Sequence, residues 1–380
     1  MLDWLRRLRG PAAERKLLAW HTPGRPAWPM RDPAAFAREG YARNAIAYRC
    51  VRLIAEAAAS APLHVGPSDH PLGRLLARPN PEQTGIELLE AFYGHLQVAG
   101  NAYLEAASIG EEAPSELYVL RPDRMSVVPG VDGWPIGWEH RVGPNVRRFE
   151  RDPITNDAPI LHLKIFNPAD DWYGLSPMEA AAFSIDIHNA GGAWNKSLID
   201  NAARPSGALV FTGAERLSEE QFQRLKGELE DMHIGAANAG RPMLLEGGLE
   251  WRPMSLSPAD MDFTEARHSA ARDIALAFGV PPMLLGIPGD NTYSNYREAN
   301  LAFWRQSALP LAQKAARAIE AWIGDRWPDA GPAAVSVDVE NVPALAIERE
   351  ALWARVGAAD FLSEDEKRRM AGVETPERPQ

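Results

Sequence analysis

Two helix-start signals of the same kind constrain the fold more than any other feature of the sequence. Ser176-Pro177-Met178-Glu179 and Ser257-Pro258-Ala259-Asp260 each place a serine N-cap before a proline at the first helical position, with a carboxylate at the third. The first predicts a long helix to about Ala203, with a kink or weak point at Gly191-Gly192. In residues 204–257 we expect strands at 208–211, 243–246 and 250–254 and a helix from the cap Ser218 to about His233. These elements predict a small α/β module between two long helices.

The residues before the first of these helices predict a mixed α/β region. Apolar residues recur at helical spacing over residues 41–61, and a short strand follows Pro62. Thr84-Gly85-Ile86-Glu87 is a capping box that opens a helix to about Ala99. Five short strands joined by turn-forming residues are then expected, at 102–106, 116–120, 125–128, 136–141 and 160–166.

After the second helix, the sequence alternates between a loop and further helices. Gly286, Pro288 and Gly289 predict a flexible stretch from Leu284 to Ser294, followed by a long helix to Ile323 that Pro310 bends. A strand is expected at 335–339, a helix at 344–357 and a short helix after a capping box at Ser363. The fold class predicted by these elements is α+β.

Charge separates the N-terminal end from the rest of the chain. Residues 1–30 carry six basic and two acidic side chains, while the whole chain has a formal charge of −11. Prolines at 23, 26 and 29 predict an extended basic arm. The acidic balance disfavours a protein that wraps DNA. The sequence shows no long apolar run and no apolar leader, so we expect no membrane span and no signal peptide. The expected compartment is reducing and cytoplasmic.

Motifs for catalysis or cofactor binding are not found in the sequence. It has no nucleophile elbow, phosphate-binding loop or dinucleotide fingerprint, and its nine histidines show no metal-ligand spacing. The lone Cys50 is interpreted as a small buried hydrophobe. We therefore expect no catalytic, cofactor or metal residues and no enzyme. The alternative is a metal-dependent hydrolase that uses Asp170 and Asp171 with a histidine, although both carboxylates fit a polar turn before a helix.

Several short motifs, in order along residues 41–325, carry a resemblance to a known family. The N-terminal motifs are Asn44-Ala45-Ile46, Ala61-Pro62-Leu63, His70-Pro71-Leu72, Arg78-Pro79-Asn80-Pro81 and Gly100-Asn101-Ala102-Tyr103. The later ones are Leu120-Arg121-Pro122-Asp123, His162, Gly174-Leu175-Ser176-Pro177, Gly240-Arg241-Pro242, Leu245-Glu246-Gly247-Gly248, Ser257-Pro258-Ala259-Asp260-Met261, Phe278-Gly279-Val280-Pro281-Pro282 and Thr292-Tyr293-Ser294-Asn295. With these motifs, the chain resembles the portal proteins of tailed bacteriophages, and its short length also allows the portal of a phage-derived gene transfer agent.

The resemblance implies a homododecameric ring at one capsid vertex, assembled in the bacterial cytoplasm, through which double-stranded DNA is packaged and ejected. It also implies the terminase large subunit, the head-to-tail adaptor and the major capsid protein as partners. The implied layout is a basic arm (1–40), a wing (41–175), a first stem helix (176–203), a clip (204–257), a second stem helix (258–283), a tunnel loop (284–294), a long kinked wing helix (295–330) and a small crown-like region (331–380).

Two sets of residues follow from that layout as candidate sites. The tunnel loop would present Gly286, Gly289, Asp290, Asn291, Thr292 and Tyr293 to DNA, with short polar groups and no cation. The clip would offer exposed acidic residues of its helix, Glu219, Glu228 and Glu230, to the terminase and the adaptor.

Overall fold

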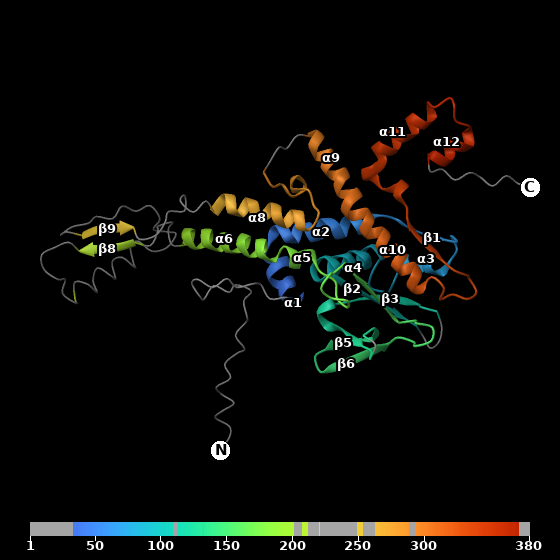
Figure 1. The fold of residues 1–380 in the computed structure, drawn as a ribbon, viewed down its shortest axis with the longest axis horizontal. Helices are drawn as coiled ribbons and strands as arrows, with labels where there is room; N and C mark the ends of the chain where they lie inside the picture. The colour runs from blue at the N-terminus through green and yellow to red at the C-terminus, as the bar shows by residue number, and fades with distance from the viewer. Residues whose placement is uncertain are drawn as a thin grey trace, which may run out of the picture. The chain divides into compact units, whose positions relative to one another are not determined.

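The computed structural model describes residues 33–108, 113–131, 133–200, 207–211, 220, 249–253, 263–288 and 293–371. The described parts form two compact units. The larger is built from residues before Phe183 together with those from Ile274 onward, and the smaller from residues between Phe183 and Asp273. Figure 1 shows the elements along the chain.

Two helices form the centre of the larger unit, and the sequence predicted both. Helix α2 (Ala45–Ser60) follows the short helices α1 (Pro33–Ala35) and η1 (Phe36–Tyr41), and Asn44 Oδ1 caps it by accepting from the N–H groups of Ile46 and Ala47. Helix α4 (Gly85–Ala99) begins with the predicted capping box at Thr84 and ends at Gly100, whose φ is 71°. Its face of Leu88, Phe92 and Leu96 is fully buried.

A three-stranded antiparallel sheet of order β3-β2-β7 packs against α4. It contains β2 (Asn101–Ala107), β3 (Glu116–Leu120) and β7 (Ile160–Lys164). Every residue of β2 except the last is buried, because α4 covers one of its faces and the neighbouring sheet lies on the other side. The predicted strand 160–166 ends two residues earlier, at Lys164.

A second antiparallel sheet has the order β4-β5-β6, with β4 (Met125–Pro129), β5 (Pro135–Val142) and β6 (Asn145–Glu150). It follows the 3-10 turn η2 (Pro122–Arg124). A separate core that includes Tyr103, Trp138 and Phe149 joins the two sheets. Strand β6 was not predicted, because five of its six residues are exposed and its pattern does not alternate.

Two segments far apart in the sequence form a small two-stranded sheet. Strand β1 (Leu63–Gly66) pairs antiparallel with β10 (Ala334–Val337). Helix α3 (Pro71–Ala77), which the sequence analysis missed, is capped by His70 and contacts β1. The His70 side chain connects the start of α3 to the chain just before β10. Its Nδ1 accepts a hydrogen bond from Leu72 N, and its Nε2 lies 3.1 Å from the carbonyl oxygen of Gly331.

The predicted long helix after Ser176 is divided in two. Ser176 Oγ accepts from Glu179 N, as a cap should, but α5 (Pro177–Ala180) ends at Ala180, and α6 (Ala182–Asp200) follows after Ala181. Helix α6 runs through Gly191 and Gly192 without a break, and the kink or weak point expected there stays a prediction. A Cβ on Gly191 would lie 2.8 Å from Arg267 Cγ, so this glycine permits the close approach of a neighbouring helix.

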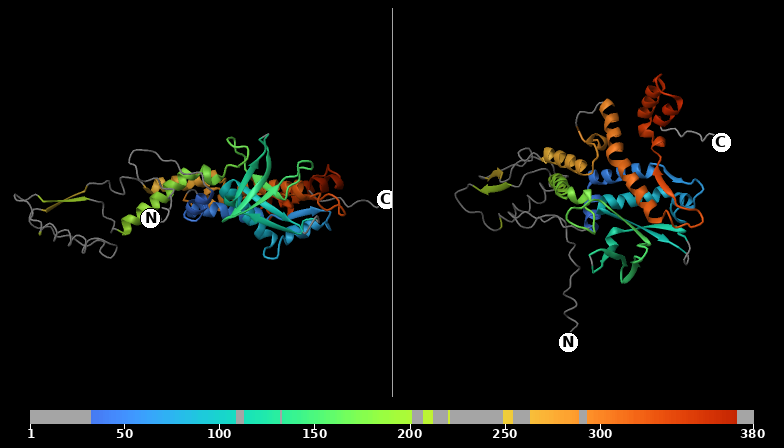
Figure 2. Two further views of the ribbon diagram at one scale, coloured as in Figure 1. Left: turned by 90° about the horizontal axis from the view of Figure 1, so that it is seen from below. Right: turned by 45° about the vertical axis from the view of Figure 1, so that its right-hand side comes forward.

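That neighbour is α8 (Phe263–Ala277), which runs beside α6 in both figures (Figures 1 and 2). Ser184 Oγ donates to Asp273 Oδ2 at 3.5 Å between the two helices. The smaller unit also contains the antiparallel pair β8 (Gly207–Phe211) and β9 (Leu249–Pro253). The start of the second helix at Ser257, the helix expected after Ser218 and the strand expected at Met243 lie outside the described residues, apart from Glu220.

The C-terminal third is mostly helical. A 3-10 turn, η4 (Pro282–Leu285), precedes α9 (Tyr293–Phe303), a π-helical turn η5 (Trp304–Ala308) and α10 (Leu309–Ile323). After β10, short turns η6 (Val339–Asn341) and η7 (Pro343–Leu345) lead to α11 (Ala346–Gly357) and α12 (Glu364–Met370). None of the helices among the described residues combines the length and the apolar character needed to cross a membrane.

Candidate functional site

The segment predicted as a flexible loop has a fixed beginning. Gly286 has the left-handed φ of 70° that its residue type favours, directly after η4. Ile287 N donates to the carbonyl of Pro282, and the Ile287 side chain is 5% exposed. Gly289, Asp290, Asn291 and Thr292 lie outside the described residues, and Tyr293 is the first residue of α9. Four residues therefore connect an anchored turn to a helix.

The chain just before this loop is fastened to the long helix that follows it. Gly279 has a φ of 66°, and its carbonyl accepts from Ser307 Oγ at 2.6 Å. A Cβ on Gly279 would lie 2.9 Å from that hydroxyl. The flanking Phe278 and Val280 are buried. The chain that leads into the loop is therefore attached to η5 through Gly279.

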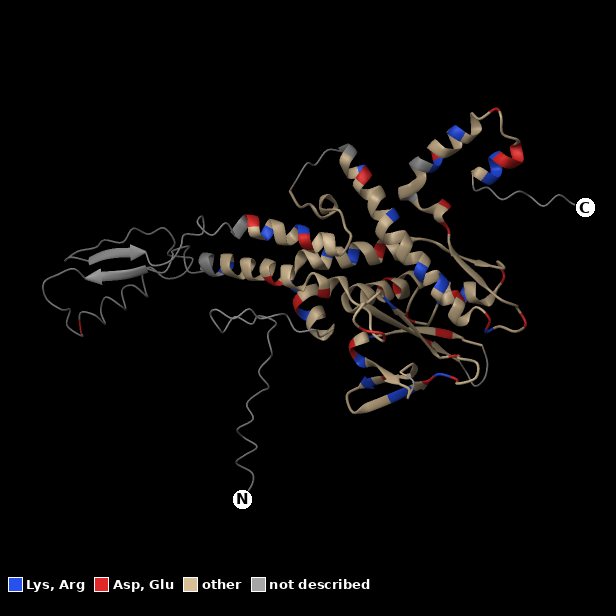
Figure 3. Cartoon of the chain, in the orientation of Figure 1, with Lys and Arg blue, Asp and Glu red and all other residues tan. Residues whose placement is uncertain are grey.

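The paired helices α6 and α8 carry few charges that could hold a polyanion. Figure 3 shows red and blue segments distributed along both helices. Arg267 and Arg272 stand on α8 with Glu265 and Asp273, and α6 adds Asp186, Lys196 and Asp200. Acidic side chains thus outnumber basic ones. Burial, with a smaller contribution from the positive charge of Arg267, lowers the pKa of His188, so this histidine adds no positive charge at neutral pH.

The acidic residues proposed from sequence as a docking surface, Glu219, Glu228 and Glu230, lie outside the described residues. Of the module that contains them, the structure describes β8 and β9, whose register pairs Gly207 with Pro253 and Phe211 with Leu249.

Three of the motifs meet at one point just before the start of α5. Asn101 Oδ1 accepts from Gly174 N at 2.8 Å and lies 2.9 Å from His162 Nε2. Gly100 and Gly174 approach so closely that a Cβ on Gly174 would lie 2.1 Å from the carbonyl oxygen of Gly100. The motifs therefore define a junction that positions Ser176, the cap of α5, against the central sheet.

His162 is held in one neutral form at this junction. Trp138 Nε1 donates to its Nδ1 at 3.4 Å, so Nε2 carries the proton that is donated to Asn101. The ring of Tyr103 stacks on the imidazole, with centroids 4.3 Å apart. Burial lowers the pKa of His162 to about 3. Sequence reasoning named this histidine only as part of a motif, and no spacing signal predicts its partners.

Asp170 and Asp171, the carboxylates of the hydrolase alternative, take part in local hydrogen bonds. Asp170 Oδ1 accepts hydrogen bonds from the backbone N–H groups of Trp172 and Tyr173 and so stabilises a turn. The backbone carbonyl of Asp171 accepts a hydrogen bond from Lys164 Nζ. Cys50 is fully buried, and burial raises the pKa of its thiol to about 12. Within the described ranges, no group of three His, Cys, Asp or Glu side chains is arranged to hold a metal ion.

The chain was compared with protein families, curated proteins and solved structures. The family model described as phage portal protein matches residues 45–372. An uncharacterised protein of Rickettsia bellii is 41% identical over 343 residues, covering 88% of each chain, and the portal protein of Enterobacteria phage HK97 is 27% identical over 293 residues, covering 73% of this chain and 66% of that protein.

A chain in the solved structure "Neck of native GTA particle computed with C12 symmetry", where GTA stands for gene transfer agent, is similar along almost its whole length. It is 51% identical, covers 93% of this chain and 96% of that chain, and has a TM-score of 0.72. The mixed α/β fold expected from sequence is confirmed, as is the resemblance that the motifs carried. The chain belongs to the phage portal protein family.

Proposed function

We propose that this chain is the subunit of a dodecameric portal ring at one vertex of a gene transfer agent or phage capsid, through which double-stranded DNA is packaged and ejected. The observation that carries the proposal is the 51% identity, over 93% of the chain, to a subunit in a particle neck solved with C12 symmetry. A ring of this kind requires a heterologous interface whose rotation closes after twelve copies.

The small number of basic residues on α6 and α8 supports a channel through which DNA can slide. Each fixed cation that neutralises a phosphate strengthens the binding of DNA and so opposes sliding. With Lys196 as the one lysine or arginine of α6, and with Arg267 and Arg272 offset by Glu265 and Asp273 on α8, a channel lined by these helices would hold DNA weakly. No catalytic step belongs to this role.

Electron microscopy of the purified protein tests the ring directly. We expect closed rings of twelve copies with an open centre, and mass photometry should give a mass near twelve times that of the chain. Monomers or dimers alone, at concentrations where circular dichroism shows the chain to be folded, would refute the ring.

Two further assignments belong to the same proposal. We infer that residues 284–294 are a tunnel loop, so deletion of Gly289 to Asn291 should leave rings and capsids intact while DNA packaging or retention fails. Normal yields of DNA-filled, transducing particles would refute this role.

We also infer that the terminase large subunit and the head-to-tail adaptor dock on residues 204–257, while the major capsid protein surrounds the ring. Reversal of Glu219, Glu228 and Glu230 together should abolish terminase binding and leave ring formation unaltered. Unchanged terminase binding and packaging would show that these residues take no part.

A further inference from the structure

Three loops at one end of the β4-β5-β6 sheet are joined by hydrogen bonds. They are the described residues of the β4–β5 turn with the start of β5 (130–136), the loop after β6 (151–158) and the loop after β7 (165–173). Arg151 N donates to the Ile136 carbonyl at 2.9 Å, and Trp172 Nε1 donates to the Gly133 carbonyl at 3.0 Å. The three loops therefore form one surface, which we call the loop patch.

Each loop of the patch exposes a large apolar side chain. On the turn, Trp134 is 74% exposed and Ile136 is 45% exposed. Ile154, after β6, is 92% exposed, and Phe166, after β7, is 79% exposed. Large apolar side chains are mostly buried in soluble proteins, and a group of exposed ones on one surface marks a binding site for another protein. Tryptophan is enriched among the residues that contribute most to such binding.

Hydrogen bonds from side chains fix the shape of two of these loops. Asp152 Oδ1 accepts from Ile154 N at 2.7 Å and from Thr155 N at 2.8 Å. Asn167 Nδ2 donates to the Tyr173 carbonyl at 3.0 Å. A surface whose loops are ordered before binding loses less conformational entropy when its partner binds. The exposed side chains of the loop patch are thus held in place for recognition.

The charges of the loop patch are mostly negative. Its exposed carboxylates among the described residues are Asp152, Asp157, Asp170 and Asp171. Arg151 is the one basic residue of the three loops within the described ranges. Its guanidinium donates to Asn156 Oδ1 at 2.9 Å and lies 5.2 Å from the centroid of the Trp138 ring, so it is already engaged. A partner with basic side chains would match this surface.

We propose that the loop patch binds a segment of another protein that carries basic side chains beside apolar ones. The apolar side chains of that segment pack on Trp134 and Ile154, and its basic side chains pair with the surrounding carboxylates. DNA does not match the patch, because the carboxylates repel its phosphates. The proposal does not depend on the ring, since the whole patch belongs to the larger unit of one chain.

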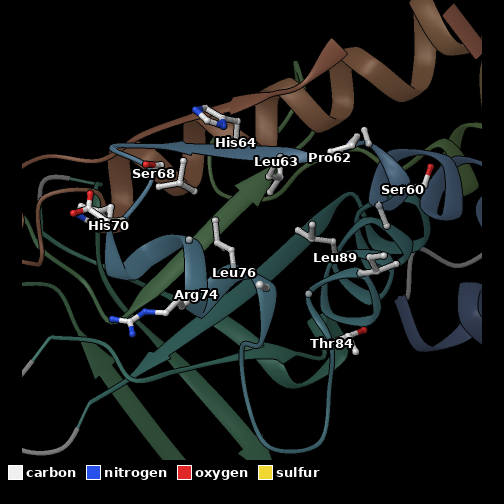
Figure 4. Close-up of a pocket in the computed structure, with 18 residues that line it drawn as sticks. Ser60, Pro62, Leu63, His64, Ser68, His70, Arg74, Leu76, Thr84 and Leu89 are labelled. Atoms are coloured by element: carbon white, nitrogen blue, oxygen red, sulfur yellow. The ribbon is translucent and has the colours of Figure 1, made fainter. Parts of the chain in front are cut away.

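A second apolar surface of the larger unit has a different balance of charge. A groove of about 980 Å³ beneath β1 is lined by Leu76 and Leu89 (Figure 4), and also by Ile86, which is 59% exposed. One acidic and one basic side chain line this groove, Asp69 and Arg74, so their charges cancel. The groove therefore supplies an exposed isoleucine without the negative charge of the loop patch.

Selection of random dodecapeptides, displayed on phage, against the purified full-length protein tests the loop patch. The enriched peptides should combine arginine or lysine with leucine, phenylalanine or tryptophan. Trp134→Ser and Ile154→Ser should each weaken the binding of a synthetic enriched peptide by about ten-fold or more, measured by fluorescence anisotropy. Asp171→Lys should also weaken it, and high salt should weaken binding to the wild type.

Ile86→Ser is the matched control for Ile154→Ser, because both replace an exposed isoleucine of the larger unit. It should leave the affinity for the peptide as in the wild type. Enriched peptides that are acidic, or whose binding depends on Ile86 and not on Ile154, would overturn the proposal. A selection in which no enriched peptide is weakened by Trp134→Ser or Ile154→Ser would overturn it as well.

Mass photometry distinguishes another protein from a second copy of this chain as the partner. We expect Trp134→Ser, Ile154→Ser and Ile86→Ser to show the same distribution of oligomers as the wild type at each concentration. Circular dichroism should confirm that all variants are folded. A loss of oligomers in the two patch variants alone would overturn the proposal, because it would show that a second copy covers the loop patch.

Discussion

Helices α4 and α12 begin with the same capping box but differ in what they bury. Glu87 N donates to Thr84 Oγ1 at 3.4 Å, and Glu366 N donates to Ser363 Oγ at the same distance. The 15 residues of α4 bury Leu88, Phe92 and Leu96 in the main core, whereas the seven residues of α12 bury none. A cap satisfies the first N–H groups of a helix, but only nonlocal partners determine whether the helix stabilises the fold.

The largest expected difference between α4 and α12 is the loss of unfolding free energy when a large side chain is truncated to alanine. Phe92→Ala in α4 should lower the free energy of unfolding by about 3–5 kcal/mol, because the removed ring leaves a void between α4 and its neighbours. Met370→Ala in α12, where the side chain is 55% exposed, should change it by no more than about 0.5 kcal/mol. Urea unfolding at one protein concentration measures both, and equal shifts would contradict the comparison.

The next effect concerns the buried polar junction at the end of α4. Asn101→Leu keeps the size of the side chain and removes the acceptor for Gly174 N and His162 Nε2, which should cost about 1–3 kcal/mol of stability. Asn145→Leu, on exposed β6, is the matched control and should be nearly neutral. A thermal unfolding midpoint that is the same for both variants would show that the junction contributes nothing.

Acid should destabilise the region around α4 before it affects α12. Burial lowers the pKa of His162 to about 3 and that of His95, on α4, to about 4, below the ordinary 6.5 of histidine. Between about pH 6.5 and pH 4, these histidines bind protons in the unfolded chain but stay neutral in the folded chain. The free energy of unfolding is therefore highest above about pH 6.5 and decreases as the pH falls toward 4. Urea midpoints at pH 7, 6 and 5 should decrease in that order.

The control for that series is His162→Gln, which removes one of the two groups and should flatten the decrease. Residues 343–371 contain no histidine, and hydrogen bonds from Ser363 lower the pKa of Glu366, so the cap of α12 should weaken only below the ordinary range of a carboxyl group. A midpoint that rises between pH 7 and pH 5 would contradict this account.

The smallest effect is that of the caps themselves. Thr84→Ala should lower global stability by about 1 kcal/mol, since α4 cannot lose its first turn without disturbing the core. Ser363→Ala removes an equivalent bond, but it should accelerate amide exchange only within α12 and leave the global unfolding midpoint unchanged. A global shift from Ser363→Ala that matches that of Thr84→Ala would show that α12 is part of the cooperative unit.

Several elements could be predicted because their signals are local. Thr84, Ser176 and Ser363 each precede residues that complete a cap, and each does cap a helix. The family could be recognised for a similar reason, since its motifs are short and ordered. Strand β6 and helix α3 were missed, because the first is exposed on nearly every residue and the second is a single short run after a histidine cap.

The sequence by itself determined the helix starts at Thr84, Ser176 and Ser363 and membership of the portal family, because each depends on neighbouring residues or on motif order. Only the tertiary structure decided that Gly191 permits helix contact, that Asn101 joins His162 to Gly174, and that β1 pairs with β10 while leaving one edge open. These contacts join residues distant in the chain, and their geometry follows from packing that no local pattern encodes.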